Sequence, residues 1–272
     1  MTRRPRSAGV AAVLLGLLAP GALWAWDREA HQAVALVAEA RLRPDTRRAV
    51  AQLLEGRPMA DVAMWPDEVR NTTHRDTYNW HFVNIPLTAA GYDARRDCRP
   101  AARGDCIVAA LERLEVILAD ASRTAHRRRE ALMFLIHLVA DLHQPLHVSN
   151  NDDVGGNRRA VGEIGGALNL HSAWDSGILR ASGKTVADLV ADANRQAPGI
   201  EATSGAGGRY ADWTAEGWRI AAQVAYRQLD GDERITDQER EAAMALIAAQ
   251  IARAGVRLAA VINRALVPPP SR

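Results

Sequence analysis

The chain has only two cysteines among its 272 residues, Cys98 and Cys106. A zinc site built entirely on thiolates needs more than two of them, so this class of metal site is excluded. Both cysteines lie in a short stretch rich in Arg, Asp, Gly and Pro. In a chain exported to an oxidising compartment, their spacing favours a structural disulfide that closes a short loop.

The apolar run near the N-terminus, 8–18, is too short to hold the chain in a membrane as a stable anchor. Basic residues precede it, and Pro20-Gly21 and a small residue at the predicted cleavage site, Ala25, follow it, a pattern typical of a secretory signal. We therefore predict a signal peptide over 1–25, cleaved before Trp26, and a mature protein that is periplasmic or secreted. An uncleaved N-terminal anchor is the alternative.

The sequence also lacks an excess of charge of either sign. It has 34 basic and 32 acidic residues, a net charge of +2. Removing the predicted signal peptide takes away three arginines and no acids, which leaves 31 basic against 32 acidic residues and a net charge of −1. Such a protein is not a generic cationic binder of nucleic acid. A polyanionic ligand would need positive charge supplied locally, by bound metal.

Helical periodicity dominates the rest of the chain and predicts an all-α single domain over 26–266. Long loops are expected at 77–106 and 148–169, the second with a small hairpin that turns at Gly165-Gly166. The tail 267–272 is expected to be disordered. The predicted helices cover 27–42, 46–54, 61–70, 107–120, 127–142, 186–193, 210–229 and 237–266.

Histidine and aspartate recur at a four-residue spacing. His137 and Asp141 lie in one predicted helix, so both side chains project from the same face, and His147 follows the end of that helix. His171 and Asp175 repeat the spacing. Imidazole and carboxylate are the ligands expected of a hydrolytic zinc site. These candidates are too many for one four-coordinate zinc with an open position, so at least two metal ions are predicted.

A single His/Asp pair of this kind is more often a surface ion pair than a metal site. His137, however, lies in the apolar segment 134–139, where an imidazole beside a carboxylate is costly unless something neutralises both. A bound metal does so, and the repetition of the pair favours metal ligands. The remaining histidines match no ligand position: His74, His126 and His143, the last expected to lie behind the ligands or at the surface.

Seven short motifs follow one another along the chain: Trp26 with His31, Trp65-Pro66-Asp67, Trp80-His81-Phe82, His137-Leu-Val-Ala-Asp141, Gln144-Pro145-Leu146-His147, Gly155-Gly156-Asn157 and His171-Ser-Ala-Trp-Asp175. In this order and combination the chain resembles the secreted single-strand-specific zinc nucleases of fungi and plants. That family has bacterial relatives and shares a superfamily with bacterial zinc phospholipase C. The motifs lie within 26–175. The rest of the chain is helical, as in that family, but contains few of its motifs.

The resemblance implies a mainly helical domain of the phospholipase C and zinc nuclease type, with three zinc ions in one cleft. The ligands implied for the first zinc are Asp67, His81, His137 and Asp141. Those implied for the second are His147, His171 and Asp175. Those implied for the third are His31, Asp141 as a bridge, and the α-amine and carbonyl of Trp26 after signal cleavage. Asp67 would also orient or deprotonate the attacking water.

The same resemblance implies an endonuclease that cleaves single-stranded DNA and RNA to 5′-phosphate products and also acts on 3′-nucleotides. Phe82 matches a base-stacking aromatic, and stacking on one ring favours unpaired bases; ordinary core packing is its alternative. Asn157 matches a substrate-contacting position. Asn84 departs from the fungal pattern, which has Asp there, so contacts to the base are expected to differ.

Two other functions compete with the nuclease. The first is a zinc phospholipase C-type phosphodiesterase, which acts on phospholipids at a membrane surface. The second is a zinc-storing helical protein without catalysis, although closed structural sites favour cysteine. The charged loop around 93–105 fits a nucleotide pocket better than a lipid surface. We expect a monomer without stable membrane association.

Overall fold

The computed structural model describes residues 26–203, 207–227 and 234–266. The predicted signal peptide and C-terminal tail therefore lie outside the described residues. The described part is mainly helical, with one small two-stranded sheet, as the periodicity predicts.

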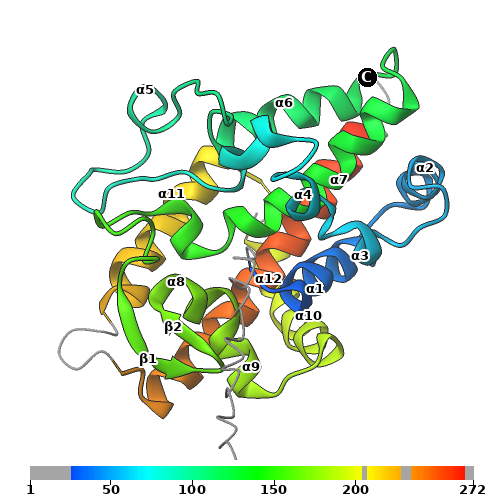
Figure 1. Ribbon diagram of the computed structural model, residues 1–272. Coiled ribbons are helices and arrows are strands. Elements are labelled where there is room, and N and C mark those ends of the chain that lie inside the picture. The colour runs from blue at the N-terminus through cyan, green and yellow to red at the C-terminus, as the bar shows by residue number, and fades with distance from the viewer. Residues whose placement is uncertain (1–25, 204–206, 228–233, 267–272) are drawn as a thin grey trace, which may run out of the picture.

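Four helices build the centre of the molecule: α1 (Arg28–Glu39), α6 (Ile107–Ala119), α7 (Ala125–Leu142) and α12 (Asp237–Leu266). Helices α7 and α12 cross the middle of the domain, with α1 beside α12 (Figure 1). From Ala131 onwards every residue of α7 is buried, because its apolar side chains meet other helices on all sides. The core of the domain therefore surrounds the helix that carries His137 and Asp141.

Helix α12 is long and apolar enough to cross a membrane by length and composition alone. However, 72% of its apolar window is buried inside the domain. Its Gly255 meets α1 so closely that an added Cβ would lie 2.3 Å from Val37 Cγ1. These contacts make α12 the core helix against which α1 packs.

The other helical segments surround this centre. The α-helices are α2 (Pro44–Leu53), α3 (Met59–Val62), α4 (Trp65–Val69), α5 (Ala94–Asp97), α8 (Leu170–Ser172), α9 (Ile178–Ser182), α10 (Val186–Ala202) and α11 (Tyr210–Ile220). The 3₁₀ turns are η1 (Arg75–His81) and η2 (Pro145–Val148), and the π-helical turns are η3 (Ala173–Gly177) and η4 (Ala221–Ala225).

The predicted hairpin is confirmed. Strands β1 (Ala160–Ile164) and β2 (Ala167–Asn169) pair antiparallel. The chain reverses at Gly165 and Gly166, whose φ angles are +53° and +83°, a region that favours glycine. The disulfide between Cys98 and Cys106 is also present, and it closes a short loop before α6.

Several predicted boundaries are wrong. The single helix expected over 61–70 is two short helices, because Pro66 lacks a backbone N–H and occupies the first turn of α4. Helix α10 continues to Ala202 through Pro198, and the helix expected over 210–229 changes into the π-helical turn η4 after Ile220. The loop expected over 77–106 contains most of η1 and all of α5.

Candidate metal centre

The last turns of α7 place His137 and Asp141 one above the other, both fully buried. His137 Nε2 lies 3.1 Å from Asp141 Oδ2. The other ring nitrogen, Nδ1, donates to the carbonyl of Ala63 at 2.7 Å. That hydrogen bond fixes the ring with Nε2 directed at the carboxylate, which is the way that metal-binding imidazoles are usually oriented.

Two upstream segments bring Asp67 and His81 to this pair. Asp67 lies in the first turn of α4 and His81 at the end of η1. His81 Nδ1 lies 3.0 Å from Asp141 Oδ2, 3.1 Å from His137 Nε2 and 3.5 Å from Asp67 Oδ1. His137 Nε2 lies 3.6 Å from Asp67 Oδ1. Four ligands around a tetrahedral zinc, with bonds of about 2.0–2.1 Å, stand about 3.3–3.4 Å apart, and these five separations of 3.0–3.6 Å lie close to that value.

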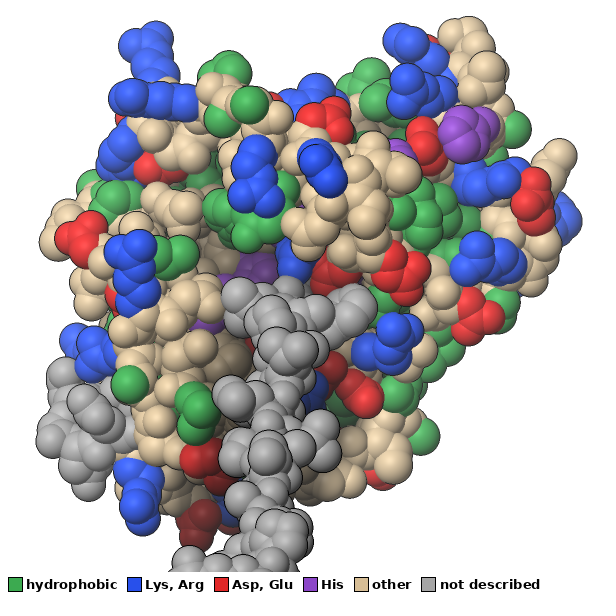
Figure 2. Space-filling view, viewed as in Figure 1, with side chains coloured by type: hydrophobic (Ala, Val, Ile, Leu, Met, Phe, Trp, Pro, Cys, Tyr) green, Lys and Arg blue, Asp and Glu red, His purple; other side chains and the backbone are tan. Residues whose placement is uncertain are grey.

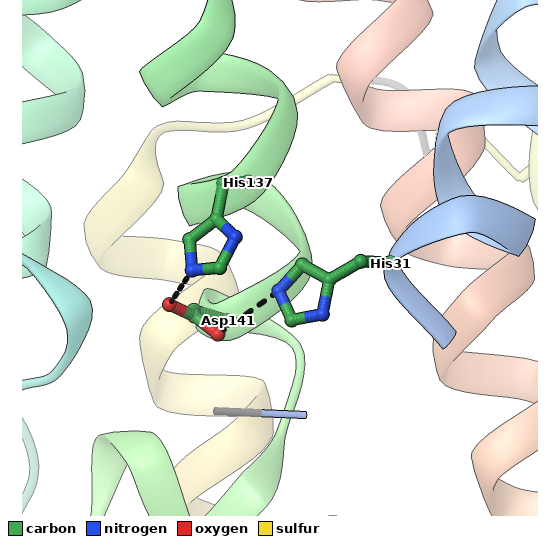
Figure 3. A group of neighbouring side chains, drawn as sticks. All are labelled: His31, His137 and Asp141. Carbon is green, nitrogen blue, oxygen red and sulfur yellow. Dashed lines mark ion pairs between the residues drawn. The ribbon is translucent and has the colours of Figure 1, made fainter. Parts of the chain in front are cut away.

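The second oxygen of Asp141 faces a different histidine. His31, on α1, places Nε2 3.3 Å from Asp141 Oδ1, and its ring stacks on that of His137 with 4.2 Å between centroids. Figure 3 shows His31 and His137 approaching the two oxygens of Asp141 from α1 and α7. The carboxylate of Asp141 therefore lies between His31 on one side and His81 and His137 on the other, where it could bridge two metal ions.

A third group lies beyond the end of α7. His147 Nε2 is 3.4 Å from Asp175 Oδ1, and His171 Nε2 is 3.1 Å from Asp175 Oδ2. The histidines are oriented by backbone carbonyls, His147 Nδ1 donating to His81 at 2.9 Å and His171 Nδ1 to Gly155 at 2.8 Å. The group offers three ligands from two rings and one carboxylate, so a bound ion would keep an open position.

Buried polar atoms without a hydrogen-bond partner test whether metal ions fit these groups. Within the described part of the chain, they include His31 Nε2, Asp67 Oδ1, Asp141 Oδ1 and His147 Nε2. An unpaired buried polar atom is costly, and native structures pair nearly all of them. Cations coordinated at these positions would satisfy them, and each nitrogen and oxygen is a ligand type that zinc accepts.

The buried histidines and carboxylates of these groups shift one another's pKa values. Burial lowers the pKa of His81 to about 4, against the attraction of Asp141. Burial also opposes protonation of His147, yet Asp141 and Asp175 raise the pKa of that ring to about 9. Although burial acts the other way, the charges of His137 and His147 hold the pKa of Asp141 well below its usual value. The carboxylates thus demand positive charge, and protons on histidine or divalent ions can supply it.

A cavity of about 310 Å³ opens over these groups. His81, His147 and His171 line it together with the three predicted substrate residues, Phe82, Asn84 and Asn157. Figure 2 shows histidine side chains in a hollow near the middle of this face, with a Lys or Arg side chain beside them. Phe82 is half-buried and Asn84 exposed, so Phe82 borders the cavity and is not enclosed in the core.

Comparison with known proteins decides the family. The S1/P1 nuclease family model matches residues 26–267. The chain belongs to the S1/P1 nuclease family.

Individual relatives agree with the family model. The chain is 30% identical to Endonuclease 4 of Arabidopsis thaliana over 93% of this chain and 92% of that protein. It is 29% identical to Nuclease S1 of Aspergillus oryzae over 62% of each chain, and 32% identical to Nuclease P1 of Penicillium citrinum over 56% of this chain and 57% of that protein. Membership in a nuclease family makes the protein a hydrolase of phosphodiester bonds.

The structure adds residues to this nuclease site that sequence reasoning missed. Arg70 lines the cavity, with Nη1 3.0 Å from Asp67 Oδ1, and Tyr78 lines it as well. The i,i+3 spacing of Asp67 and Arg70 is a signal that could have found the first of these. Gln144, quoted only as part of a motif, is fully buried and donates to Asp175 Oδ1 at 2.5 Å.

His143 is buried, which agrees with a place behind the ligands and excludes one at the surface. Its Nδ1 donates to the Val139 carbonyl at 2.7 Å and its Nε2 accepts from Arg257 at 2.9 Å. Burial and the charge of Arg257 keep its pKa well below the usual value. His143 therefore joins α7 to α12 as a neutral structural residue.

The loop 150–157 holds His171 in place, and Asp153 organises that loop. Asp153 Oδ1 accepts from the backbone of Gly156 at 2.8 Å and from the hydroxyl of Tyr226 at 2.9 Å. Gly155, whose carbonyl orients His171, has φ of +60°, and an added Cβ would lie 2.8 Å from the Leu146 carbonyl oxygen. The orientation of His171 thus depends on a loop conformation that Asp153 stabilises.

We expect Asp153→Ala to weaken metal retention at the group containing His171 by up to about tenfold, the low end of the effect of losing a group that orients a metal ligand, because Asp153 acts on His171 through the loop and not by direct contact. The measurement is metal content and nuclease rate across a series of zinc-buffered solutions. Asp152→Asn is the matched control, because Asp152 is exposed and its φ of +58° is one that Asn tolerates. Unchanged zinc dependence of the Asp153 variant would contradict this role.

Proposed function

We propose that the protein is a three-zinc endonuclease that cleaves single-stranded DNA and RNA to 5′-phosphate products and also hydrolyses 3′-nucleotides. The observation that carries the proposal is the arrangement around Asp141, whose Oδ2 faces His81 and His137 and whose Oδ1 faces His31. The third group stands beside them and faces the same cavity. Membership in the S1/P1 nuclease family supports the reaction class.

The proposed ligand sets are those that the family motifs imply, and the groups of neighbouring ligand atoms, in which His137 lies close to both His31 and His81, support them. Asp67, His81, His137 and Asp141 would hold the first zinc. His147, His171 and Asp175 would hold the second. His31, Asp141 and the amine and carbonyl of a processed Trp26 would hold the third. Trp26 is buried, and the next residue, Asp27, donates its N–H to the Asp175 carbonyl at 2.8 Å, which supports a fixed N-terminus beside the cluster.

When bound, zinc ions lower the pKa of a coordinated water towards neutrality and offset the charge that develops at phosphorus. The protein's own part is positioning and proton transfer. Asp67 is the proposed base that orients or deprotonates the attacking water, because its Oδ2 has no hydrogen-bond partner among the described residues. Arg70 lies against the same carboxylate and borders the cavity, where it would bind a phosphate oxygen.

Recognition of unpaired bases would come from Phe82. Its ring borders the cavity beside the ligand His81, and stacking on one aromatic ring accepts any base that is not already paired in a duplex. Asn84 and Asn157 offer amide donors and acceptors to that base. No feature of the described residues favours the phospholipid alternative, and a cavity open onto three histidines differs from the closed sites of a storage protein.

Export of the protein is part of the proposal. The signal peptide over 1–25 predicts export to the periplasm or the exterior, and cleavage before Trp26 would complete the third zinc site. Export also agrees with the disulfide between Cys98 and Cys106, since such bonds persist in oxidising compartments.

The test is metal-dependent cleavage by the purified mature protein. We expect it to degrade single-stranded DNA and RNA, to leave duplex DNA nearly intact, to lose activity in a chelator and to regain activity with zinc. End-group analysis should find 5′-phosphates. No cleavage of any polynucleotide between pH 5 and pH 9 with zinc present, or release of phosphocholine from short-chain lecithin by a protein inert on nucleic acid, would contradict the proposal.

A further inference from the structure

Tyr78 lies at the rim of the cavity between two arginines. The guanidinium carbon of Arg103 is 3.5 Å from the centroid of its ring, and that of Arg70 is 5.6 Å away. Phe82 meets the same ring edge-on, with 6.1 Å between centroids. Arg70, Tyr78 and Phe82 line the cavity, and Arg103, which is not part of that lining, stacks on Tyr78. Cations and aromatic rings side by side are the combination that proteins use to bind single strands through phosphates and bases.

The disulfide-closed loop holds Arg103 against this edge through its backbone. The N–H of Asn79 donates to the Arg103 carbonyl at 2.8 Å, and its side-chain amide donates to the Gly104 carbonyl at 2.9 Å. At Gly104, φ is +97° and an added Cβ would lie 2.6 Å from the Asp76 carbonyl oxygen. The loop 98–106 thus docks tightly on η1, the segment that ends at His81, and presents Arg103 over Tyr78.

These residues form a path from the metal groups to the surface. The side chain of Asp67 is 1% exposed. The side chain of Arg70, whose Nη1 lies 3.0 Å from Asp67 Oδ1, is 12% exposed. Tyr78 is half-buried and Arg103 is exposed. The predicted mature form has nearly equal numbers of basic and acidic residues and a net charge of −1, so the chain as a whole does not attract a polyanion. Two arginines along one path provide a local field that does.

We propose that Arg103 and Tyr78 form a subsite for the nucleotides next to the scissile phosphate, and that this subsite makes the enzyme prefer polynucleotides to mononucleotides. The inference rests on the proposed nuclease function and deepens it. A strand that leaves the metal groups along this path would place a neighbouring phosphate on the Arg103 guanidinium and a neighbouring base or sugar on the Tyr78–Arg103 stack. A 3′-mononucleotide has no such neighbour, so the subsite contributes nothing to its hydrolysis.

The experiment compares two substrates, a ten-nucleotide oligothymidylate and thymidine 3′-monophosphate, with zinc-loaded wild type and variants. We expect Arg103→Ala to lower kcat/KM for the oligonucleotide about five- to twentyfold, mostly through KM, because one phosphate contact and its stack are lost. The rate on the mononucleotide should stay within about twofold of wild type. Arg103→Lys should restore part of the loss, because it keeps the charge but not the planar stack.

Salt dependence separates a phosphate contact from a structural role. For single strands each phosphate contact contributes about −0.7 to the slope of log K against log salt, so Arg103→Ala should flatten the oligonucleotide slope by about 0.7. Arg99→Ala is the matched control, because Arg99 lies in the same loop and donates Nε to the Arg95 carbonyl at 2.9 Å. It should leave both substrates and the slope unchanged.

The outcomes distinguish the two proposals. Equal losses on both substrates, an unchanged salt slope, or the same effect from Arg99→Ala would overturn the subsite while the nuclease function stands. A zinc-loaded wild type that hydrolyses neither substrate would overturn the nuclease function and this subsite with it.

Discussion

Replacing Asp141 with asparagine is expected to lower nuclease activity by at least about a thousandfold, because one side chain serves two ligand groups in a buried site. Asp141 Oδ2 lies 3.0 Å from His81 Nδ1 and 3.1 Å from His137 Nε2, while Oδ1 lies 3.3 Å from His31 Nε2. Asparagine has the same shape as aspartate, but its amide N–H₂ would point either at His81 and His137 or at His31. It also removes the negative charge that aspartate presents to all three histidines. Neither rotamer of the amide can serve as a bridge.

Metal content gives the sharper measurement. The variant should bind fewer zinc ions per chain than wild type, and added zinc should not restore its rate. Asp61→Asn is the control, an exposed aspartate in the first turn of α3, which should keep full metal content and activity. Circular dichroism should show that both variants are helical. An Asp141→Asn protein with wild-type zinc content and rate would mean that this carboxylate is not a shared ligand.

The part of the site on one helix could be predicted from the sequence, because a four-residue spacing on a helix fixes which side chains share a face. His137 and Asp141 required nothing more. Asp67 and His81 have no such local relation to α7; only the resemblance to a family indicated that they meet it. Their positions depend on how α4 and η1 pack against α7. One contact of this packing is the hydrogen bond from His137 Nδ1 to the carbonyl of Ala63, which lies just before α4.

The Tyr78–Arg103 contact could not be predicted from spacing at all. The two residues are 25 positions apart, in a stretch without helical or strand periodicity. They meet because the disulfide closes the loop and because Gly104 allows the loop to approach η1. Helices α6, α7 and α12 are predicted almost to the residue, whereas the two short helices α3 and α4 are predicted as one, since a four- or five-residue helix carries too little periodic signal.

Adding one residue before Trp26 is expected to remove the third zinc and to lower activity by at least about a hundredfold. A free α-amine has a pKa near 8 and can ligate metal once its proton is displaced. An added residue converts that amine into an amide nitrogen, which has no available lone pair. The chain cannot easily move to compensate, because Trp26 is 1% exposed and Asp27 is held by the Asp175 carbonyl and caps α1.

The comparison needs proteins whose first residue is established by mass spectrometry. One begins at Trp26, one carries a glycine before it, and a third carries the glycine after Arg272 as the control. The control should match wild type in zinc content and rate, and the N-terminal variant should lose one zinc. If it retains every zinc and its full rate, the amine is not a ligand, and His31 with Asp141 must be completed by water. Loss of one zinc with the other groups intact would instead make signal cleavage a step in assembling the active site, so that the protein becomes a nuclease only after export.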